Sequence, residues 1–240
     1  MITSVSPVDG RYASKTSELS LYFSEYALIK YRVKVEVEYF IALAESGIPQ
    51  LQLSEDEKST IRAIHDQFNE DDAHDVKNIE STTNHDVKAV EYFIKQQMKE
   101  EGLGDRIEFV HFALTSQDIN NTVLPLMIKD ANQKVMMPNL DHIITRLEEK
   151  ANAWIDVPML ARTHGQPASP TTIGKEMMVF VERLREQVKW LEKIELRAKF
   201  GGATGQFNAH VAAFPNRDWI RFADDFIARL NLKRSMWTTQ

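Results

Sequence analysis

A heptad pattern in the last third of the chain constrains the fold more than any other sequence feature. Its apolar members are spaced alternately four and three residues apart: Met177, Val181, Leu184, Val188 and Leu191. A seam of this kind is typical of long helices that pack lengthwise against other helices. This part of the chain is therefore expected to contribute to a helical bundle, either within one subunit or in an oligomer.

The segment 24–46 has an ambiguous pattern. Val33, Val35 and Val37 alternate with charged residues, which is the pattern of a strand. Other apolar residues of the segment lie at helical spacing, and the segment is long for a strand. It also ends at Gly47, a helix-stop signal. These features together favour a helix.

Further helices are expected in both halves of the chain, and no alternation of strands and helices is visible. They follow the capping box Ser54–Glu57, span 86–99, begin near 115, continue after Pro138 and span 216–230. Pro125 should kink its helix or mark the first turn. Residues 1–20 are rich in Ser, Pro, Gly and Thr, and we expect them to form an extended loop.

The predicted fold class is all-α, with two domains. Residues 1–114 are expected to form a helical N-terminal domain. Residues 115–240 are expected to form part of a long central helical bundle. About three long helices in this second domain leave apolar faces that require partners.

Composition excludes several classes of protein. The net charge of −6 argues against a nucleic-acid-binding surface, which would show a clustered basic excess. The absence of cysteine excludes disulfides, thiol nucleophiles and thiolate zinc sites. No apolar stretch is long enough for a membrane span, and the first ten residues lack the features of a signal peptide. A cytoplasmic location is expected.

Four polar clusters interrupt the apolar pattern at junctions between loops and helices. The first, Ser6–Tyr12, contains Arg11. It could be an ordinary turn with an exposed arginine. Alternatively, the guanidinium could bind a phosphate or carboxylate, because its planar donors match these anions in bidentate fashion.

The second cluster, Thr82–Asp86, directly precedes a predicted helix. Helix capping by Asn84 or Asp86 would explain two of its five residues. It would not explain two threonines and His85 in the same place, and a helix N-terminus with hydroxyls and amides can bind an anion. The third cluster, Thr115–Asp118, has the same two interpretations: capping alone, or hydroxyl groups that bind a carboxylate.

The fourth cluster, Arg162–Ala168, lies between two long helices and is stiffened by prolines and a glycine. A single loop histidine is most often an ordinary surface residue. His164, between Thr163 and Gln166 on a rigid loop, is nevertheless a candidate general acid or base, because imidazole exchanges protons near neutral pH.

Other motifs carry no clear chemistry. Gly201–Gly205 lacks the Lys-Ser/Thr end of a phosphate-binding loop and is expected to be a flexible break that could line a site. No two histidines lie four residues apart, so a helical zinc site is unsupported. The acidic run Glu70–Asp75 could bind a cation weakly, but a solvated acidic face is the preferred interpretation.

Taken together, the motifs Ser-Pro-Val-Asp-Gly-Arg-Tyr, Thr-Thr-Asn-His-Asp-Val-Lys-Ala-Val-Glu-Tyr-Phe, Thr-Ser-Gln-Asp-Ile-Asn-Asn and Arg-Thr-His-Gly-Gln-Pro-Ala resemble the adenylosuccinate lyase family. The resemblance covers the whole chain, and the bacterial form is the closest likeness. The family belongs to the fumarase/aspartase superfamily. It splits adenylosuccinate into AMP and fumarate, and SAICAR into AICAR and fumarate, in purine nucleotide biosynthesis.

The resemblance implies a role for each matching position. His164 corresponds to the general acid that protonates the departing nitrogen. The implied substrate-binding residues are Arg11 and Tyr12 for the nucleotide, Asn84, His85 and Asp86 in a second motif, Thr115 and Ser116 for a carboxylate, and Gln240. No metal and no cofactor is implied.

The resemblance also implies an assembly and reveals one departure. Family members are homotetramers whose active sites are built from several subunits. The family's Ser-Ser-x-Met-Pro-x-Lys-x-Asn-Pro loop, which carries the catalytic base, does not occur in this sequence, and the C-terminal helical domain is also missing. We therefore expect the 240 residues alone to be inactive. The alternatives are another superfamily lyase, such as an argininosuccinate lyase, and a non-catalytic helical scaffold.

Overall fold

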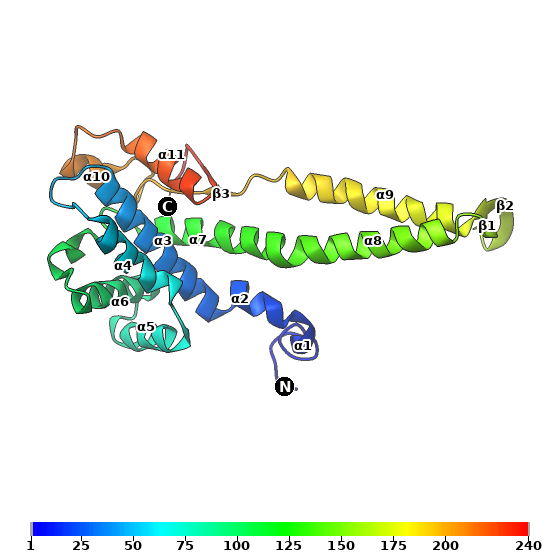
Figure 1. Cartoon of the computed structure of the whole chain (residues 1–240), viewed down its shortest axis with the longest axis horizontal. Helices are drawn as coiled ribbons and strands as arrows, with labels where there is room; N and C mark the ends of the chain where they lie inside the picture. Colours follow the sequence, from blue (N-terminus) through cyan, green and yellow to red (C-terminus); the bar gives the residue numbers. More distant parts are fainter. Residues whose placement is uncertain (1, 240) are drawn as a thin grey trace. The chain divides into compact units, whose positions relative to one another are not determined.

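The computed structural model describes residues 2–239 and is predominantly helical, which confirms the predicted fold class (Figure 1). It divides into two compact units. The first contains the residues up to Lys129 and those from Leu196 onward, and the second spans Asp130–Glu195. The predicted domain boundary at residues 114 and 115 remains a prediction.

Helix α3 (Glu25–Glu45) is the centre of the first unit. It begins at Ser24, whose hydroxyl accepts a hydrogen bond from the Ala27 amide. The helix predicted for this segment is confirmed. Val33, Val35 and Val37 are all fully buried. Because the helix is buried on nearly all sides, apolar residues occur at both strand-like and helical spacing, and this explains the ambiguity of the sequence.

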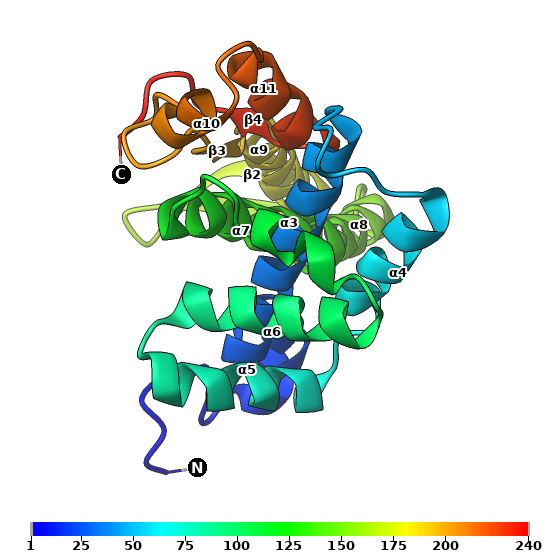
Figure 2. The ribbon, with the colours of Figure 1, turned by 90° about the vertical axis from the view of Figure 1, so that its left-hand side faces the viewer.

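Three helices pack around α3: α4 (Glu55–Asp66), α5 (Glu70–Thr83) and α6 (Asp86–Glu100). Figure 2 shows α5 and α6 side by side. The predicted capping box at Ser54 is confirmed, since its hydroxyl accepts from the Glu57 amide and the Glu57 carboxylate accepts from the Ser54 amide. A second capping box at Asn69 starts α5. The acidic run that follows Asn69 is therefore the start of a helix that the sequence analysis missed.

The extended loop predicted for residues 1–20 is only partly correct. Three short helical turns follow Tyr12: α1 (Ala13–Thr16), η1 (Ser17–Leu19) and α2 (Ser20–Phe23). Serine hydroxyls stabilise these turns, because Ser20 donates to the carbonyl of Ser17 and Ser24 donates to that of Ser20. Such local side-chain bonds are weak sequence signals, since serine is equally common in loops.

The end of the chain completes the first unit with four short elements and a left-handed residue, Phe207. They are β3 (Arg197–Ala198), α10 (Asn208–Ala213), α11 (Trp219–Arg229) and β4 (Lys233–Arg234), with β3 parallel to β4. Helix α11 begins three residues later than predicted, because Asp218 is its N-cap and accepts from the Arg221 amide. Its predicted inward residues Trp219 and Phe226 are buried. Helix α10 was not predicted.

Two further elements follow α6 in the sequence. The short helix η2 (Gly104–Phe109) follows α6, and α7 (Ser116–Ala131) starts at the third polar cluster. Pro125 lies in the interior of α7, so it does not mark the first turn.

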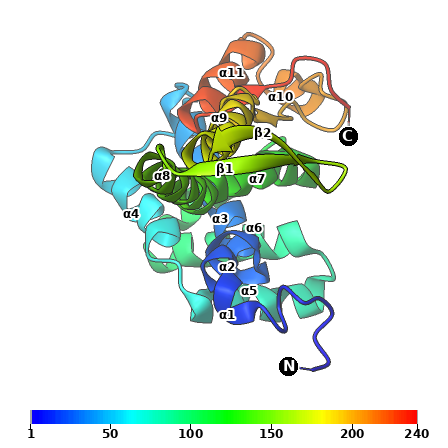
Figure 3. The same ribbon diagram turned by 90° about the vertical axis from the view of Figure 1, so that its right-hand side faces the viewer.

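The second unit is an antiparallel pair of helices capped by a hairpin. It contains a π-helical turn, η3 (Asn132–Met136), then α8 (Met137–Ala153), β1 (Pro158–Thr163), β2 (Gln166–Thr172) and α9 (Ile173–Glu192). Helices α8 and α9 pack along their length, and Figure 3 looks onto the hairpin at their end. The heptad seam forms the α9 contact face, with Val181 buried and its other members half-buried.

Helices α8 and α9 approach closely where the hairpin joins them. The amide of Gly174 donates to the carbonyl of Trp154 at 3.0 Å. A β-carbon on Gly174 would lie 2.3 Å from the carbonyl oxygen of Ala151 and 2.7 Å from the backbone of Ile155. Only glycine fits at this contact.

The β-hairpin corrects the prediction of an irregular loop around His164. Strands β1 and β2 are antiparallel, with Thr163 opposite Gln166. The two residues between them, His164 and Gly165, both have positive φ angles, 47° and 77°. This pair of angles is typical of the two-residue turns that join hairpin strands. The prolines around the turn hid the strands, because proline is rare inside sheets but tolerated in edge strands such as these.

Candidate active site

The α5–α6 junction carries the second polar cluster in a defined arrangement. Asn84 ends α5 in the left-handed region, with φ of 50°, and its side chain is exposed. His85 is the N-cap of α6, because its Nδ1 accepts from the Lys88 amide at 3.1 Å. Capping of α6 by Asn84 or Asp86, one of the two interpretations considered above, is therefore wrong. With Nδ1 accepting this hydrogen bond, the ring presents Nε2–H as a donor from a half-exposed side chain.

Both carboxylate oxygens of Asp86 are engaged by the protein. Oδ1 accepts from the Val87 amide at 2.8 Å, and Oδ2 accepts from Nη2 of Arg32 at 2.6 Å. Burial would raise the pKa of Asp86, but the Val87 amide and the Arg32 charge lower it below its ordinary value. Asp86 is thus an ionised anchor for the start of α6.

Arg32 links the second cluster to the third. Its Nε donates to Oδ1 of Asn120 at 3.0 Å, and Asn120 lies one helical turn after Ser116 in α7. The Arg32 side chain is only 6% exposed. One buried guanidinium therefore contacts the junction before α6 and the first turns of α7.

A buried carboxylate organises the start of α7. Oδ2 of Asp118 accepts from the Thr115 amide at 2.9 Å and from its hydroxyl at 3.3 Å. Oδ1 of the same residue accepts from Nζ of Lys199 at 2.7 Å and from the amides of Gly201 and Gly202. The glycine-rich segment was expected to be a flexible break. Here it is a well-anchored partner of a charged group.

The two hydroxyl groups at this helix start differ in what they can offer. The Thr115 hydroxyl donates its proton to Asp118, so toward a ligand it can only accept a hydrogen bond. The Ser116 side chain makes no hydrogen bond within residues 2–239, so it is free to donate. Of the two, Ser116 is the better donor for a substrate carboxylate.

The sequence analysis missed His111 and Glu36. The imidazole Nδ1 lies 2.5 Å from Oε1 of Glu36, which is 1% exposed on α3. Burial would lower the pKa of His111, but the Glu36 charge and hydrogen bond overcome this effect and raise it. His111 has a positive φ of 58°. The sequence offered little signal, because Arg32 and Glu36 are only two of several charged residues in α3, and the pattern does not show which of them are buried.

The first cluster is exposed and ordered by its own backbone. The Tyr12 amide donates to the Pro7 carbonyl at 2.8 Å, and the Arg11 guanidinium lies 5.5 Å from the centre of the Tyr12 ring. Within residues 2–239, Arg11 has no acidic partner, so its charge is available to an anion. No hydrogen bond or ion pair among these residues links Arg11 or Tyr12 to Arg32.

The remaining predicted residues lie elsewhere. His164 is exposed at the tip of the hairpin in the second unit. Gln240 lies outside the described residues. The structure therefore brings together the second and third clusters, through Arg32, and adds His111 near them.

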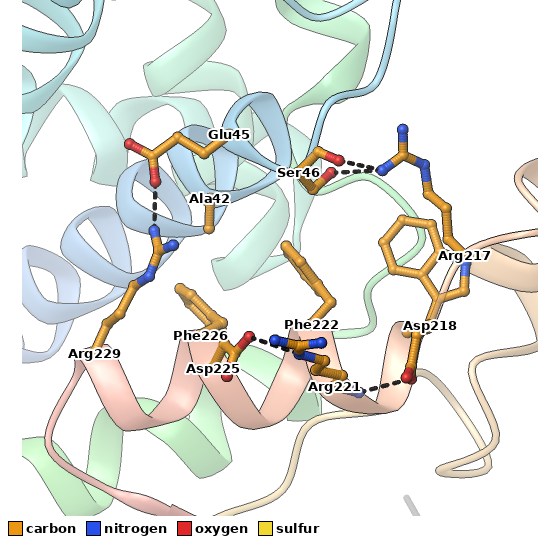
Figure 4. A pocket seen from close by; sticks show the side chains of 11 residues that line it. Ala42, Glu45, Ser46, Arg217, Asp218, Arg221, Phe222, Asp225, Phe226 and Arg229 are labelled. Carbon is orange, nitrogen blue, oxygen red and sulfur yellow. Dashed lines mark hydrogen bonds and ion pairs between the residues drawn. The ribbon is translucent and has the colours of Figure 1, made fainter.

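Other features of the described residues argue against a metal site, a membrane span and a second candidate site. Among residues 2–239, no three acidic or histidine side chains are grouped so that they could bind a metal ion. None of the helices described there combines the length and apolarity of a membrane span. A groove of about 400 Å³ between the end of α3 and α11 contains two ion pairs, Arg229 with Glu45 and Arg221 with Asp225 (Figure 4). No predicted site residue lines this groove.

Comparison with known proteins gives consistent matches. The sequence model of a family described as lyase matches residues 10–235. Adenylosuccinate lyases match the whole chain, at 52% identity for Dictyostelium discoideum, 45% for Escherichia coli and 43% for Haemophilus influenzae. The chain spans 53% of the length of each of these relatives.

Solved structures share the fold. A fumarate lyase from a Mesorhizobium species has a TM-score of 0.73 at 25% identity, over 94% of this chain and 49% of its own. A 3-carboxy-cis,cis-muconate lactonizing enzyme from Pseudomonas putida has a TM-score of 0.72 at 20% identity, over 92% of this chain and 48% of its own. The second likeness concerns the fold alone.

Proposed function

The chain belongs to the lyase family whose model covers residues 10–235, and from this we propose that the whole protein is an adenylosuccinate lyase. It would eliminate fumarate from adenylosuccinate to give AMP, and from SAICAR to give AICAR. The observation that carries the proposal is 43–52% identity to adenylosuccinate lyases along the entire chain. The convergence of polar groups at the starts of α6 and α7 supports it.

The reaction makes three chemical demands. A base removes a proton from the carbon next to a carboxylate, the resulting carbanion is stabilised, and an acid protonates the departing nitrogen. Preorganised donors suit the second demand, because fixed dipoles stabilise charge where it develops. We assign this task to the Ser116 hydroxyl and to Nε2–H of His85, which both have donors free within residues 2–239.

The remaining roles follow from charge and exposure. Arg11, unpaired by any acid in the described chain, would bind the substrate phosphate together with Tyr12. Asn84, Asp86 and Thr115 would complete the substrate-binding surface. His164 would be the general acid, a role that suits an exposed imidazole on a rigid turn. Gln240 would contact the substrate as well.

The active enzyme would be a homotetramer with active sites shared between subunits, located in the cytoplasm. The second unit supports assembly, because large apolar side chains on its helices, on its hairpin and just after α9 are strongly exposed. They are Ile143, Leu160, Phe180, Trp190 and Ile194, each 50–66% exposed. A contiguous exposed apolar patch marks an interaction surface, and we propose that these side chains form one that is covered in the assembled enzyme. The 240 residues alone should show no turnover, since they lack the serine-loop signature.

The test is a substrate assay on the whole protein, with fumarate release as the readout. Adenylosuccinate and SAICAR should be cleaved and argininosuccinate should not; cleavage of argininosuccinate alone would overturn the assignment. His164→Ala should reduce kcat by about 10²–10⁴-fold, the usual contribution of a general acid. His142→Ala is a matched control, because His142 is an exposed histidine of the same unit. Equal activity in the two variants would refute the role of His164.

A further inference from the structure

Helix α3 holds two charged side chains in surroundings where charge is costly. Arg32 is 5% exposed and Glu36 is 1% exposed, and they lie one turn apart on the same face. Burying an ion removes it from water at a cost of several kcal/mol, which is recovered only with good partners. Apolar residues at these two positions would have stabilised the core at less cost. Their partners indicate what the charges do.

Arg32 donates hydrogen bonds to two different segments. Nη2 binds Asp86 at the start of α6, and Nε binds Asn120 near the start of α7. Asp86 is 45% exposed, so it does not itself need a buried partner to be stable as an anion. Satisfying a buried acid therefore does not explain this arginine. The geometry of the guanidinium explains why an arginine is present here, because this group donates hydrogen bonds in two fixed directions within one plane.

Glu36 makes the same kind of contact one turn further along. It binds His111, which lies four residues before Thr115 in the segment that leads into α7. Helix α3 therefore contacts that segment on both sides of the α7 start. Since α3 is the most deeply buried helix of the first unit, it provides a rigid reference for the segments around it.

We propose that Arg32 is a positioning residue that fixes the separation of His85 from Thr115 and Ser116, so that these two substrate-binding segments act as one preformed surface. The inference rests on the proposed function. Arg32 acts through Asp86 and Asn120. Displacing a binding group by about 1 Å can cost up to about 10²-fold in rate, so a single bridging side chain is sufficient to control activity.

We call the contacts of Arg32 with Asp86 and Asn120 the bridge. Two variants of the whole protein remove its hydrogen bond to Asn120, one by changing the donor and the other by changing the acceptor. Arg32→Lys keeps the buried charge and its pairing with Asp86, but an ammonium lacks the second donor in a fixed plane. Asn120→Ala removes the acceptor and leaves the arginine paired. Arg62→Lys is the matched control, because Arg62 donates to Glu38 on the far side of α3 and is 40% exposed.

We expect each bridge variant to lower kcat/KM for adenylosuccinate by about tenfold or more, chiefly through kcat, because His85 and Ser116 are assigned to the developing carbanion; the control should change it by less than about twofold. The double variant should be no worse than either single variant, because both remove one interaction. Additive losses, or single losses below twofold, would overturn the proposal.

Hydrogen exchange supplies a readout that needs no activity. In Arg32→Met, which removes the contacts with both Asp86 and Asn120, backbone amides of 85–88 and of 115–118 should both exchange faster than in wild type, with the Arg62→Lys protein unchanged. Faster exchange in one segment only, or in neither, would contradict a bridge. A wild-type protein that fails to cleave adenylosuccinate would refute the proposed function, whereas the exchange result would still decide whether Arg32 couples the two segments.

Discussion

His210 should make the protein sensitive to acid by an amount that can be calculated. Its side chain is completely buried on α10, with the ring centre 4.8 Å from that of Trp219. The Tyr39 hydroxyl donates to the carbonyl of Phe112 and lies 3.0 Å from Nε2 of His210. Nε2 must therefore carry the proton. Nδ1 has no partner within residues 2–239, so a proton added there would find no acceptor.

Burial lowers the pKa of His210 from 6.5 to about 4, although the charge of Asp118 acts in the opposite direction. The folded state therefore keeps the ring neutral, while the unfolded state binds a proton below pH 6.5. The free energy of unfolding therefore has its full value above pH 6.5 and decreases as the pH falls toward 4. At pH 5 the loss is about 2 kcal/mol, since each unit of pH below the unfolded pKa costs about 1.4 kcal/mol.

Urea denaturation at pH 7.5 and pH 5 tests this value. His210→Gln retains a polar side chain but cannot titrate, so it should lose about 2 kcal/mol less than wild type between the two pH values. His142→Ala, an exposed histidine, is the control and should follow wild type. If His210→Gln and wild type lose stability equally, within about 0.5 kcal/mol, then the buried imidazole is not the source of acid sensitivity.

Three further perturbations test other parts of the structure. Because the pKa of His111 is raised in the folded state, its protonation stabilises the fold fully below pH 6.5 and less as the pH rises through the folded pKa. Glu36→Gln should therefore lower the free energy of unfolding more at pH 6 than at pH 9 in urea titrations. Lys199→Met leaves the Asp118 charge buried without its ammonium partner and should lower the unfolding free energy by about 3–5 kcal/mol; a loss below 1 kcal/mol would contradict this pairing. Gly174→Ala should cost about 1–3 kcal/mol or more by overpacking, and an unchanged melting temperature would show that the helices can separate at little cost.

Apolar periodicity predicted the long elements well. The helices α3, α6 and α9 each carry a continuous apolar pattern over at least fifteen residues. The spacing of the apolar residues therefore indicated a helix directly, or, for α3, the length of the segment decided between strand and helix. Helix α5 was missed because acidic residues fill its first turn and only Ala73 and Val76 are buried. Helix α10 has six residues, too few to show a period.

The candidate site was only partly accessible from the sequence. Local motifs identified His85 and Ser116, because polar residues at helix starts are conspicuous between apolar runs. They could not identify Arg32, which is 88 residues from Asn120 in the sequence and binds it only in the folded chain. The same applies to the partnership of Glu36 and His111 across 75 residues. Contacts between distant segments leave no periodic pattern.

The turn that holds His164 restricts the substitutions that evolution can sample there. A left-handed backbone strongly disfavours β-branched side chains and favours glycine, asparagine, aspartate and histidine. Of these, only histidine exchanges a proton near neutral pH without help from its surroundings. In a lineage that keeps both this hairpin and an acid at its tip, histidine is therefore the residue that best meets both requirements.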